Sequence, residues 1–221
     1  MLTSSKYIQI TKIIKIEYPI LLLSSILGMM VMISSNDLIV FYMGLELQSL
    51  ALYVLASFNR ENLLSTEAGV KYFVLSALSS GLLLYGCSLI YGFSNSTNFV
   101  LIAENLNSNN YGLTFGIVFI LVGLAFKISA VPFHMWAPDV YQGSPTSVTL
   151  FFAVLPKIAA LTVFIRFLYI PFINMIDQWQ MIVVFLSIRG VIIPPIVSIP
   201  RVRGVTSKRR TSVTSPANTA P

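Results

Sequence analysis

The stretch GLAFKISAVPFHMWAPDVYQGSP, residues 123–145, decides how this chain folds. It ends a long apolar run, yet it places Lys127, Pro132 and His134 within eight residues. A lysine ammonium at the centre of a bilayer costs at least ~3 kcal/mol on insertion scales. Because a proline removes a helical hydrogen bond, we expect a discontinuous membrane helix with its break near Pro132.

The composition is typical of a polytopic membrane protein. Hydrophobic residues make up 56% of the 221 residues and charged residues only 10%, whereas soluble domains carry roughly 25% charged residues. The net charge of +6 arises in residues 189–221, which hold six basic and no acidic side chains, because residues 1–188 hold eight of each. The charge therefore does not indicate nucleic-acid binding.

The chain contains one cysteine, Cys87, and one histidine, His134. This set cannot hold an iron–sulfur cluster or a structural zinc ion, and no P-loop or GxGxxG motif is present. We therefore expect no cofactor and no metal site in this chain.

Apolar runs long enough to cross a bilayer recur along the chain, since about 20 residues suffice for a helix. The predicted fold class is all-α, a polytopic transmembrane bundle of about five to six spans. A tight turn joins the first two spans, which should form an antiparallel hairpin, and the loop 93–112 is predicted to be polar throughout. The predicted spans are residues 18–35, 37–57, 70–92, 113–131, 147–170 and, on a weaker pattern, 179–199.

The chain divides into a basic N-terminal segment (1–17), a transmembrane domain (18–188) and a basic tail rich in Pro, Ser and Thr (189–221) that is expected to be disordered. Basic residues precede the first span and flank the link from the second to the third, whereas the alternate links have none. This places the N-terminus on the matrix or cytoplasmic side. The N-terminal segment indicates an uncleaved first span, with a transit peptide ending near Glu17 as the alternative.

Two more charges, Glu46 and Lys157, lie near the middle of predicted spans. Lys157 follows Pro156, which cannot donate to the carbonyl of Phe152, so both central lysines lie beside a gap in helical hydrogen bonding. Burial favours a neutral amine and a nearby carboxylate favours the charged form. At an effective dielectric of ~20, charges ~4 Å apart interact by ~4 kcal/mol, which is enough to bind and release a proton if Glu46 approaches Lys127.

Structural interpretations stand beside this one. Buried charges can tie helices together without moving protons, and His134 can equally be an interfacial residue with satisfied hydrogen bonds. Aromatic side chains near span ends are typical of interfacial anchors. The residues interpreted in this way are Tyr42, Tyr53, Tyr85, Tyr91, Trp136 and Trp179.

Four motifs together resemble a known family: FYMGLELQSLALYVLAS (41–57), STEAGVKYFVLSALSSGLLLYGCSLIYG (65–92), VGLAFKISAVPFHMWAPDVYQGSPTSVT (122–149) and LPKIAAL (155–161). They are similar to the subunit 2 (bacterial subunit N) family of proton-pumping NADH:quinone oxidoreductase, respiratory complex I. More distant relatives are the large subunits of Mrp-type cation/proton antiporters. The likeness runs from about residue 16 to residue 188.

The resemblance implies an antiporter-like fold and a set of site residues. Glu46 matches the family's membrane glutamate, Lys127 the lysine of its discontinuous helix, and Lys157 the lysine of the following helix. His134 falls on a position that would assist the relay. The enzyme activity would belong to the assembly, because the resemblance implies no NADH or quinone site in this chain.

The resemblance also implies partners and a location. Flavin and iron–sulfur clusters would lie in partner subunits, alongside other membrane-arm subunits and membrane lipids. The family usually has more helices before and after the matched ones, so a separate polypeptide could supply the rest. The expected home is the mitochondrial inner membrane, with a bacterial plasma membrane as the alternative. The rival functions are a cation/proton antiporter subunit and a structural membrane subunit without a relay.

Overall fold

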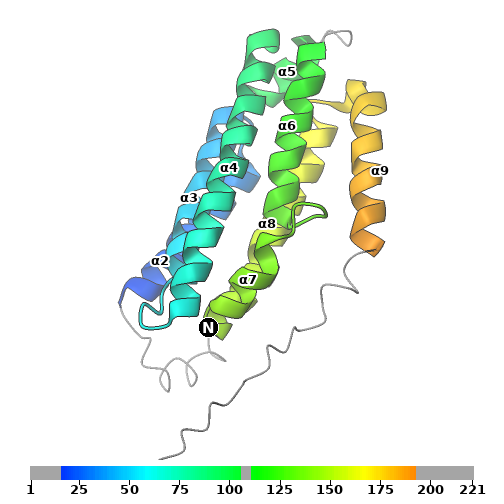
Figure 1. The fold of residues 1–221 in the computed structure, drawn as a ribbon. Coiled ribbons are helices and arrows are strands. Elements are labelled where there is room, and N and C mark those ends of the chain that lie inside the picture. Colours follow the sequence, from blue (N-terminus) through cyan, green and yellow to red (C-terminus); the bar gives the residue numbers. More distant parts are fainter. Residues whose placement is uncertain (1–15, 106–110, 193–221) are drawn as a thin grey trace, which may run out of the picture.

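The computed structural model describes residues 16–105 and 111–192, with side chains to residue 188. Most of the predicted segments 1–17 and 189–221 therefore lie outside the described residues. The regular elements of the described part are helices, which run side by side along a common direction (Figure 1). The all-α prediction is confirmed.

Among the described residues, five helices are long and apolar enough to cross a membrane, within the range of five to six spans predicted. A sixth apolar helix, α9 (Ile176–Ile192), follows a short 3-10 turn, η1 (Ile173–Met175). It passes the expected start of the disordered tail at residue 189, since the first proline that can stop it is Pro194. The five long helices are α2 (Glu17–Ser34), α3 (Leu38–Ala56), α4 (Leu63–Ser94), α6 (Tyr111–Ile128) and α8 (Thr146–Tyr169).

The helices α2 and α3 form the predicted hairpin. Asp37 caps α3, because its Oδ1 atom accepts a hydrogen bond of 2.8 Å from the backbone N–H of Ile39. The two helices touch through glycines: a Cβ atom on Gly28 would lie 2.6 Å from the backbone nitrogen of Gln48. This close approach fixes the height of Gln48 in the bundle.

The prediction that the loop 93–112 is polar throughout is wrong. It contains a short helix, α5 (Phe99–Asn105), whose side chains Phe99 and Ile102 are buried. The backbone N–H of Phe99 donates to the carbonyl of Asn36 at 2.9 Å, which holds this segment on the turn between α2 and α3. The apolar run FVLIA is too short to cross a bilayer, but it is long enough to close the end of the core.

The membrane helix that begins with α6 is discontinuous, as predicted. It ends at Ile128, Ser129 adopts a left-handed conformation with φ of 60°, and the chain resumes as α7 (Trp136–Gly143). In Figure 1, α7 lies beyond the end of α6 and beside the lower part of α4. The link between α6 and α7 is partly exposed, since Pro132 and Met135 are exposed while Val131 is buried.

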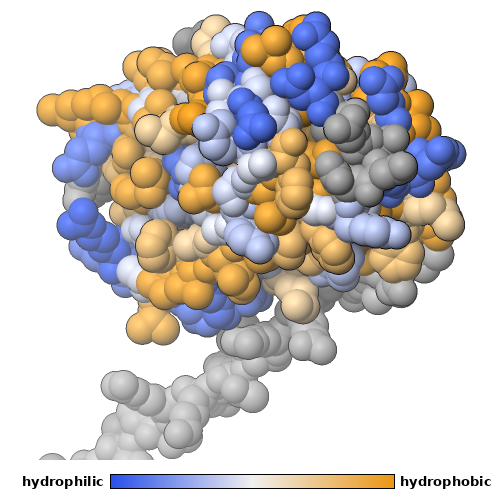
Figure 2. Space-filling model, turned by 90° about the horizontal axis from the view of Figure 1, so that it is seen from above, coloured by the Kyte–Doolittle hydropathy of each residue, from blue (hydrophilic) through white to orange (hydrophobic). Residues whose placement is uncertain are grey.

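The outside of the bundle is apolar, and many of its internal contacts are made by small polar side chains. Exposed large apolar side chains occur on every long helix, and Figure 2 shows apolar residues around much of the outline when the bundle is seen end-on. Buried serines lie where helices meet, as is common in membrane bundles. They include Ser25, Ser49, Ser65, Ser76, Ser79 and Ser80.

Candidate functional site

Lys127 lies in the last turn of α6 and points into the bundle, where the hydroxyl of Ser76 on α4 receives it. Its Nζ atom donates to the Ser76 Oγ atom at 2.5 Å. The same oxygen accepts a hydrogen bond of 2.7 Å from the Tyr53 hydroxyl on α3. The Lys127 ammonium also lies 6.0 Å from the centroid of the Tyr53 ring, within the range of a cation–π contact. Three helices therefore converge on one charge.

Trp136 holds the broken end of α6 in place. Its Nε1 atom donates to the carbonyl of Phe126 at 3.0 Å, which satisfies a backbone group at the break. Its ring stacks on Tyr72 with 4.8 Å between centroids and on Phe126 with 5.8 Å. The expectation that Trp136 and Tyr53 are interfacial anchors is wrong, since only 5% and 7% of these residues are exposed. In the sequence both lie close to the ends of predicted spans, but both side chains face the core.

Glu46 lies on α3 near Lys127 without touching it. The carboxylate acts electrostatically on the Lys127 ammonium, yet the ion pairs found within 4.0 Å in the described part join Lys71 to Glu67 and Asp139. The Oε1 atom of Glu46 is buried and has no hydrogen-bond partner among the described residues. A buried carboxylate oxygen without a partner is costly, and a polar group placed beside this atom would therefore be stabilised.

Lys157 and His134 lie near α7. The Lys157 Nζ atom is 5.5 Å from the centroid of the Tyr141 ring. His134 belongs to the link between α6 and α7, and its Nδ1 atom is buried without a partner among the described residues. No hydrogen bond or ion pair of the described part joins His134 to Glu46, Lys127 or Lys157. The structure therefore places the two lysines in the same bundle but gives no direct contact between them.

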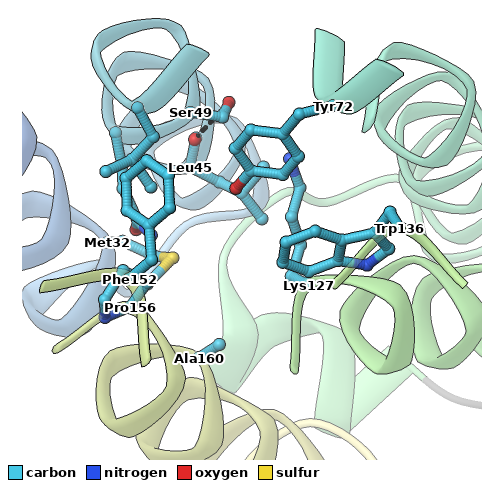
Figure 3. Close-up of a pocket in the computed structure, with 11 residues that line it drawn as sticks. Met32, Leu45, Ser49, Tyr72, Lys127, Trp136, Phe152, Pro156 and Ala160 are labelled. Carbon is cyan, nitrogen blue, oxygen red and sulfur yellow. Dashed lines mark hydrogen bonds between the residues drawn. The ribbon is translucent and has the colours of Figure 1, made fainter. Parts of the chain in front are cut away.

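A small cavity of about 20 Å³ is lined by residues of α2, α3, α4, α6, α7 and α8. In Figure 3, Lys127, Tyr72 and Trp136 lie on one side of it and Leu45, Ser49 and Phe152 on the other. Its lining also contains Met32, Gln48, Leu52, Pro156 and Ala160. The wall is largely apolar with a few polar groups, and it brings Lys127 to the same space as Pro156, the residue next to Lys157.

Residues 35–202 match the family model described as "NADH:quinone oxidoreductase/Mrp antiporter, TM". This chain belongs to that family. The match covers well over half of the chain, and it includes Glu46, Lys127, His134 and Lys157. The resemblance stated from the four motifs is confirmed.

Relatives in the NADH:quinone oxidoreductase/Mrp antiporter family agree with this placement. The NADH-quinone oxidoreductase subunit N of Pelagibacter ubique is 78% identical over 89% of this chain, which covers 42% of that relative's length. Respiratory complex I of Thermus thermophilus contains a chain with a TM-score of 0.63 and 38% identity, over 69% of this chain and 34% of that one. A chain of the Mrp complex from Dietzia sp. has a TM-score of 0.72 and 25% identity, over 80% of this chain and 33% of that one. The chain thus spans less than half the length of these relatives, and its antiporter-like fold is confirmed.

Sequence reasoning missed the groups that hold Lys127. Ser76 and Tyr53 contact Lys127 from positions 51 and 74 residues away in the sequence. Gln48 lines the cavity and follows Glu46 by two residues, but its amide carries no signal in a single sequence. Such partners are defined only by helix packing.

The segment α7 is fixed to α4 at its outer face. The Lys71 Nζ atom lies 2.8 Å from the Asp139 Oδ2 atom of α7 and 2.8 Å from the Glu67 Oε1 atom. These side chains are about half exposed, so the pairs contribute little to stability. The pair between Lys71 and Asp139 fixes the position of α7 along the length of α4.

Proposed function

We propose that this chain is part of the membrane arm of a NADH:quinone oxidoreductase and takes part in proton translocation there. Partner subunits, with flavin and iron–sulfur clusters, carry electrons from NADH to quinone, and this chain holds neither of those sites. The 78% identity to subunit N from Pelagibacter ubique supports the assignment to this assembly.

The observation that carries the proton role is the ammonium group of Lys127, held by the Ser76 hydroxyl at a broken helix with Glu46 in electrostatic range. Burial opposes the charge on an amine, and a carboxylate favours it. A shift of Glu46 by a few ångströms therefore changes the proton affinity of Lys127. The titration belongs to the coupled pair and not to one residue.

In this proposal Lys127 receives a proton and releases it towards Lys157, with His134 assisting beside α7. Pro156 supports the direction of transfer, because it lines the cavity that Lys127 enters and precedes Lys157 in α8. Glu46 sets when Lys127 holds its proton.

We place the chain in a bacterial plasma membrane with its N-terminus on the cytoplasmic side. The relatives named above are bacterial, which favours this alternative over the mitochondrial inner membrane. The distribution of basic residues in the links supports the orientation. Other membrane-arm subunits and lipids are the proposed neighbours.

The test is proton pumping by the assembled enzyme in vesicles after Lys127→Met or Glu46→Gln. Both variants should assemble and lose most NADH-driven pumping. Glu61→Gln removes an exposed carboxylate in the link before α4 and serves as the matched control, which should pump normally. Normal pumping by both site variants would refute the relay role, and failure to assemble would favour charges that only tie helices together.

A second candidate is a cation/proton antiporter subunit that needs no redox partner. The TM-score of 0.72 with the Mrp complex chain favours it. Purification under mild conditions separates the two: flavin and iron–sulfur subunits should accompany the chain if it belongs to NADH:quinone oxidoreductase. Sodium-dependent proton exchange without these subunits would support the antiporter.

A further inference from the structure

The side chain of Gln48 is buried beside the cavity with no assigned role. Only 8% of the residue is exposed, and its Oε1 atom has no hydrogen-bond partner among the described residues. A buried amide oxygen is nearly always hydrogen-bonded in proteins. Because Gln48 lines the cavity that Lys127 also lines, an acceptor and a donor border the same small space.

The size of this space selects its ligand. A cavity needs about 10–15 Å³ to hold one water molecule, and this one measures about 20 Å³. It is too small for an organic substrate or a lipid chain. A buried water also needs two to four polar partners and typically has three. A third polar group, besides Gln48 and Lys127, would therefore make the cavity well suited to bind one.

The third group comes from α8. Pro156 lacks an N–H, so it leaves the carbonyl of Phe152 without its usual helical donor. Phe152 and Pro156 both line the cavity. An acceptor on α3, a donor on α6 and an acceptor on α8 make a set of three, which matches the typical number for a buried water.

We propose that the cavity binds a single water molecule and that Gln48 is its positioning residue. This inference rests on the proposed proton role of Lys127. With Lys127 charged, the water accepts from the Nζ atom and donates to the Gln48 Oε1 atom and the Phe152 carbonyl. With Lys127 neutral, the water rotates and donates one hydrogen to the Nζ atom while the other stays on Gln48. The water can thus bond both protonation states without any movement of the helices.

The direct test is a map of the assembled enzyme at a resolution that shows ordered water. Density within about 3.2 Å of both the Gln48 Oε1 atom and the Lys127 Nζ atom supports the proposal. A direct contact between the two side chains, or a dry cavity, overturns it. Either negative result leaves the pumping defect of Lys127→Met intact, so the failure of this inference is distinguishable from the failure of the proposed function.

The functional test removes the acceptor at constant shape. Gln48→Met should assemble, lose the water density and lower NADH-driven pumping about tenfold, the effect of one hydrogen bond to a charged network. The pH dependence of pumping should shift, which a merely structural role would not cause. Leu55→Met, a buried apolar exchange on the same helix away from the cavity, should leave pumping and its pH profile unchanged. Normal pumping by Gln48→Met overturns the positioning role.

A second variant fills the cavity and leaves both polar side chains in place. Ala160→Val adds more volume than the cavity offers to one water, so it should reproduce the loss of density and of pumping. Ala159→Val adds the same volume to a neighbouring buried residue of α8 that does not line the cavity. Equal defects in the two valine variants would show a packing effect and would count against the water site.

Discussion

The Nζ atom of Lys127 and the Oγ atom of Ser76 lie 2.5 Å apart, across the contact between α6 and α4. The hydroxyl of Ser76 also accepts a hydrogen bond from Tyr53, so one small oxygen joins α3, α4 and α6. A hydroxyl oxygen can accept from an N–H of a charged or of a neutral amine. Lys127 is therefore held by a group that suits both of its protonation states.

Ser76→Ala should lower proton pumping about tenfold, because a hydrogen bond to a charged group contributes ~1.5–3 kcal/mol. The variant should still assemble, since alanine fits the space and favours the helix. NADH-driven acidification of vesicles measures the effect.

Ser88→Ala is the matched control for this change. Ser88 lies on the same helix, and its hydroxyl donates to the carbonyl of Tyr85 in that helix at 2.7 Å. It should pump normally. Equal loss in both variants would mean that α4 is sensitive to any lost hydroxyl and that the contact with Lys127 is unimportant.

Tyr53→Phe should have a smaller effect than Tyr53→Leu. Phenylalanine keeps the ring that lies 6.0 Å from the ammonium and removes the hydroxyl, which donates to Ser76. Leucine removes both, and a desolvated cation–π contact contributes up to ~2 kcal/mol. The pumping rates of the two variants in vesicles would separate the contribution of the ring from that of the hydroxyl. Equal rates would show that the ring does not act on Lys127.

Gly28→Ala should weaken the hairpin of α2 and α3. The new Cβ atom would meet the backbone of Gln48 at 2.6 Å, so the helices must separate, at a cost of ~1–3 kcal/mol. The thermal stability of the purified enzyme, or the yield of assembled enzyme, measures this cost.

Gly81→Ala provides the opposite case on α4. No atom lies within 4 Å of its added Cβ, so the change should be neutral or stabilising by up to ~1 kcal/mol through helix propensity. Similar losses in the two alanine variants would contradict the packing argument.

Much of the fold follows from the sequence for physical reasons that individual residues illustrate. A bilayer fixes the length of an apolar helix, so the spans around Glu46 and Lys157 could be located by counting. Pro132 marked the discontinuous helix because its ring cannot continue one. Whether Glu46, Lys127, His134 and Lys157 relay protons stays a prediction, since the geometry brings some of them together without showing transfer.

The rest depends on packing that a single sequence does not encode. From the sequence Trp136 is predicted to be an interfacial anchor, but the break between α6 and α7 places its side chain in the core. The segment that forms α5 is predicted to be a polar loop because its apolar run is short. The contacts of Lys127 with Ser76 and Tyr53 join helices that are distant in the chain. Periodicity cannot find them, because neither partner has a neighbour in sequence that marks it.

Pro156→Ala separates stability from function at the centre of α8. Alanine restores the N–H that the carbonyl of Phe152 lacks, and a proline inside a helix costs up to ~3 kcal/mol relative to alanine. The variant should therefore raise the thermal stability of the assembled enzyme. It should also lower pumping, since the carbonyl would bond its own helix instead of the cavity that Lys127 enters.

Ala153→Gly tests whether α8 responds in this way to any change of backbone stability. It alters an exposed position of the same helix without touching the cavity, and it should lower stability by ~1 kcal/mol while pumping stays normal. If Pro156→Ala were more stable and pumped at the normal rate, the free carbonyl would have no part in proton transfer. A loss of both stability and pumping would instead show that Pro156 itself is required for the packing of α8 against α6.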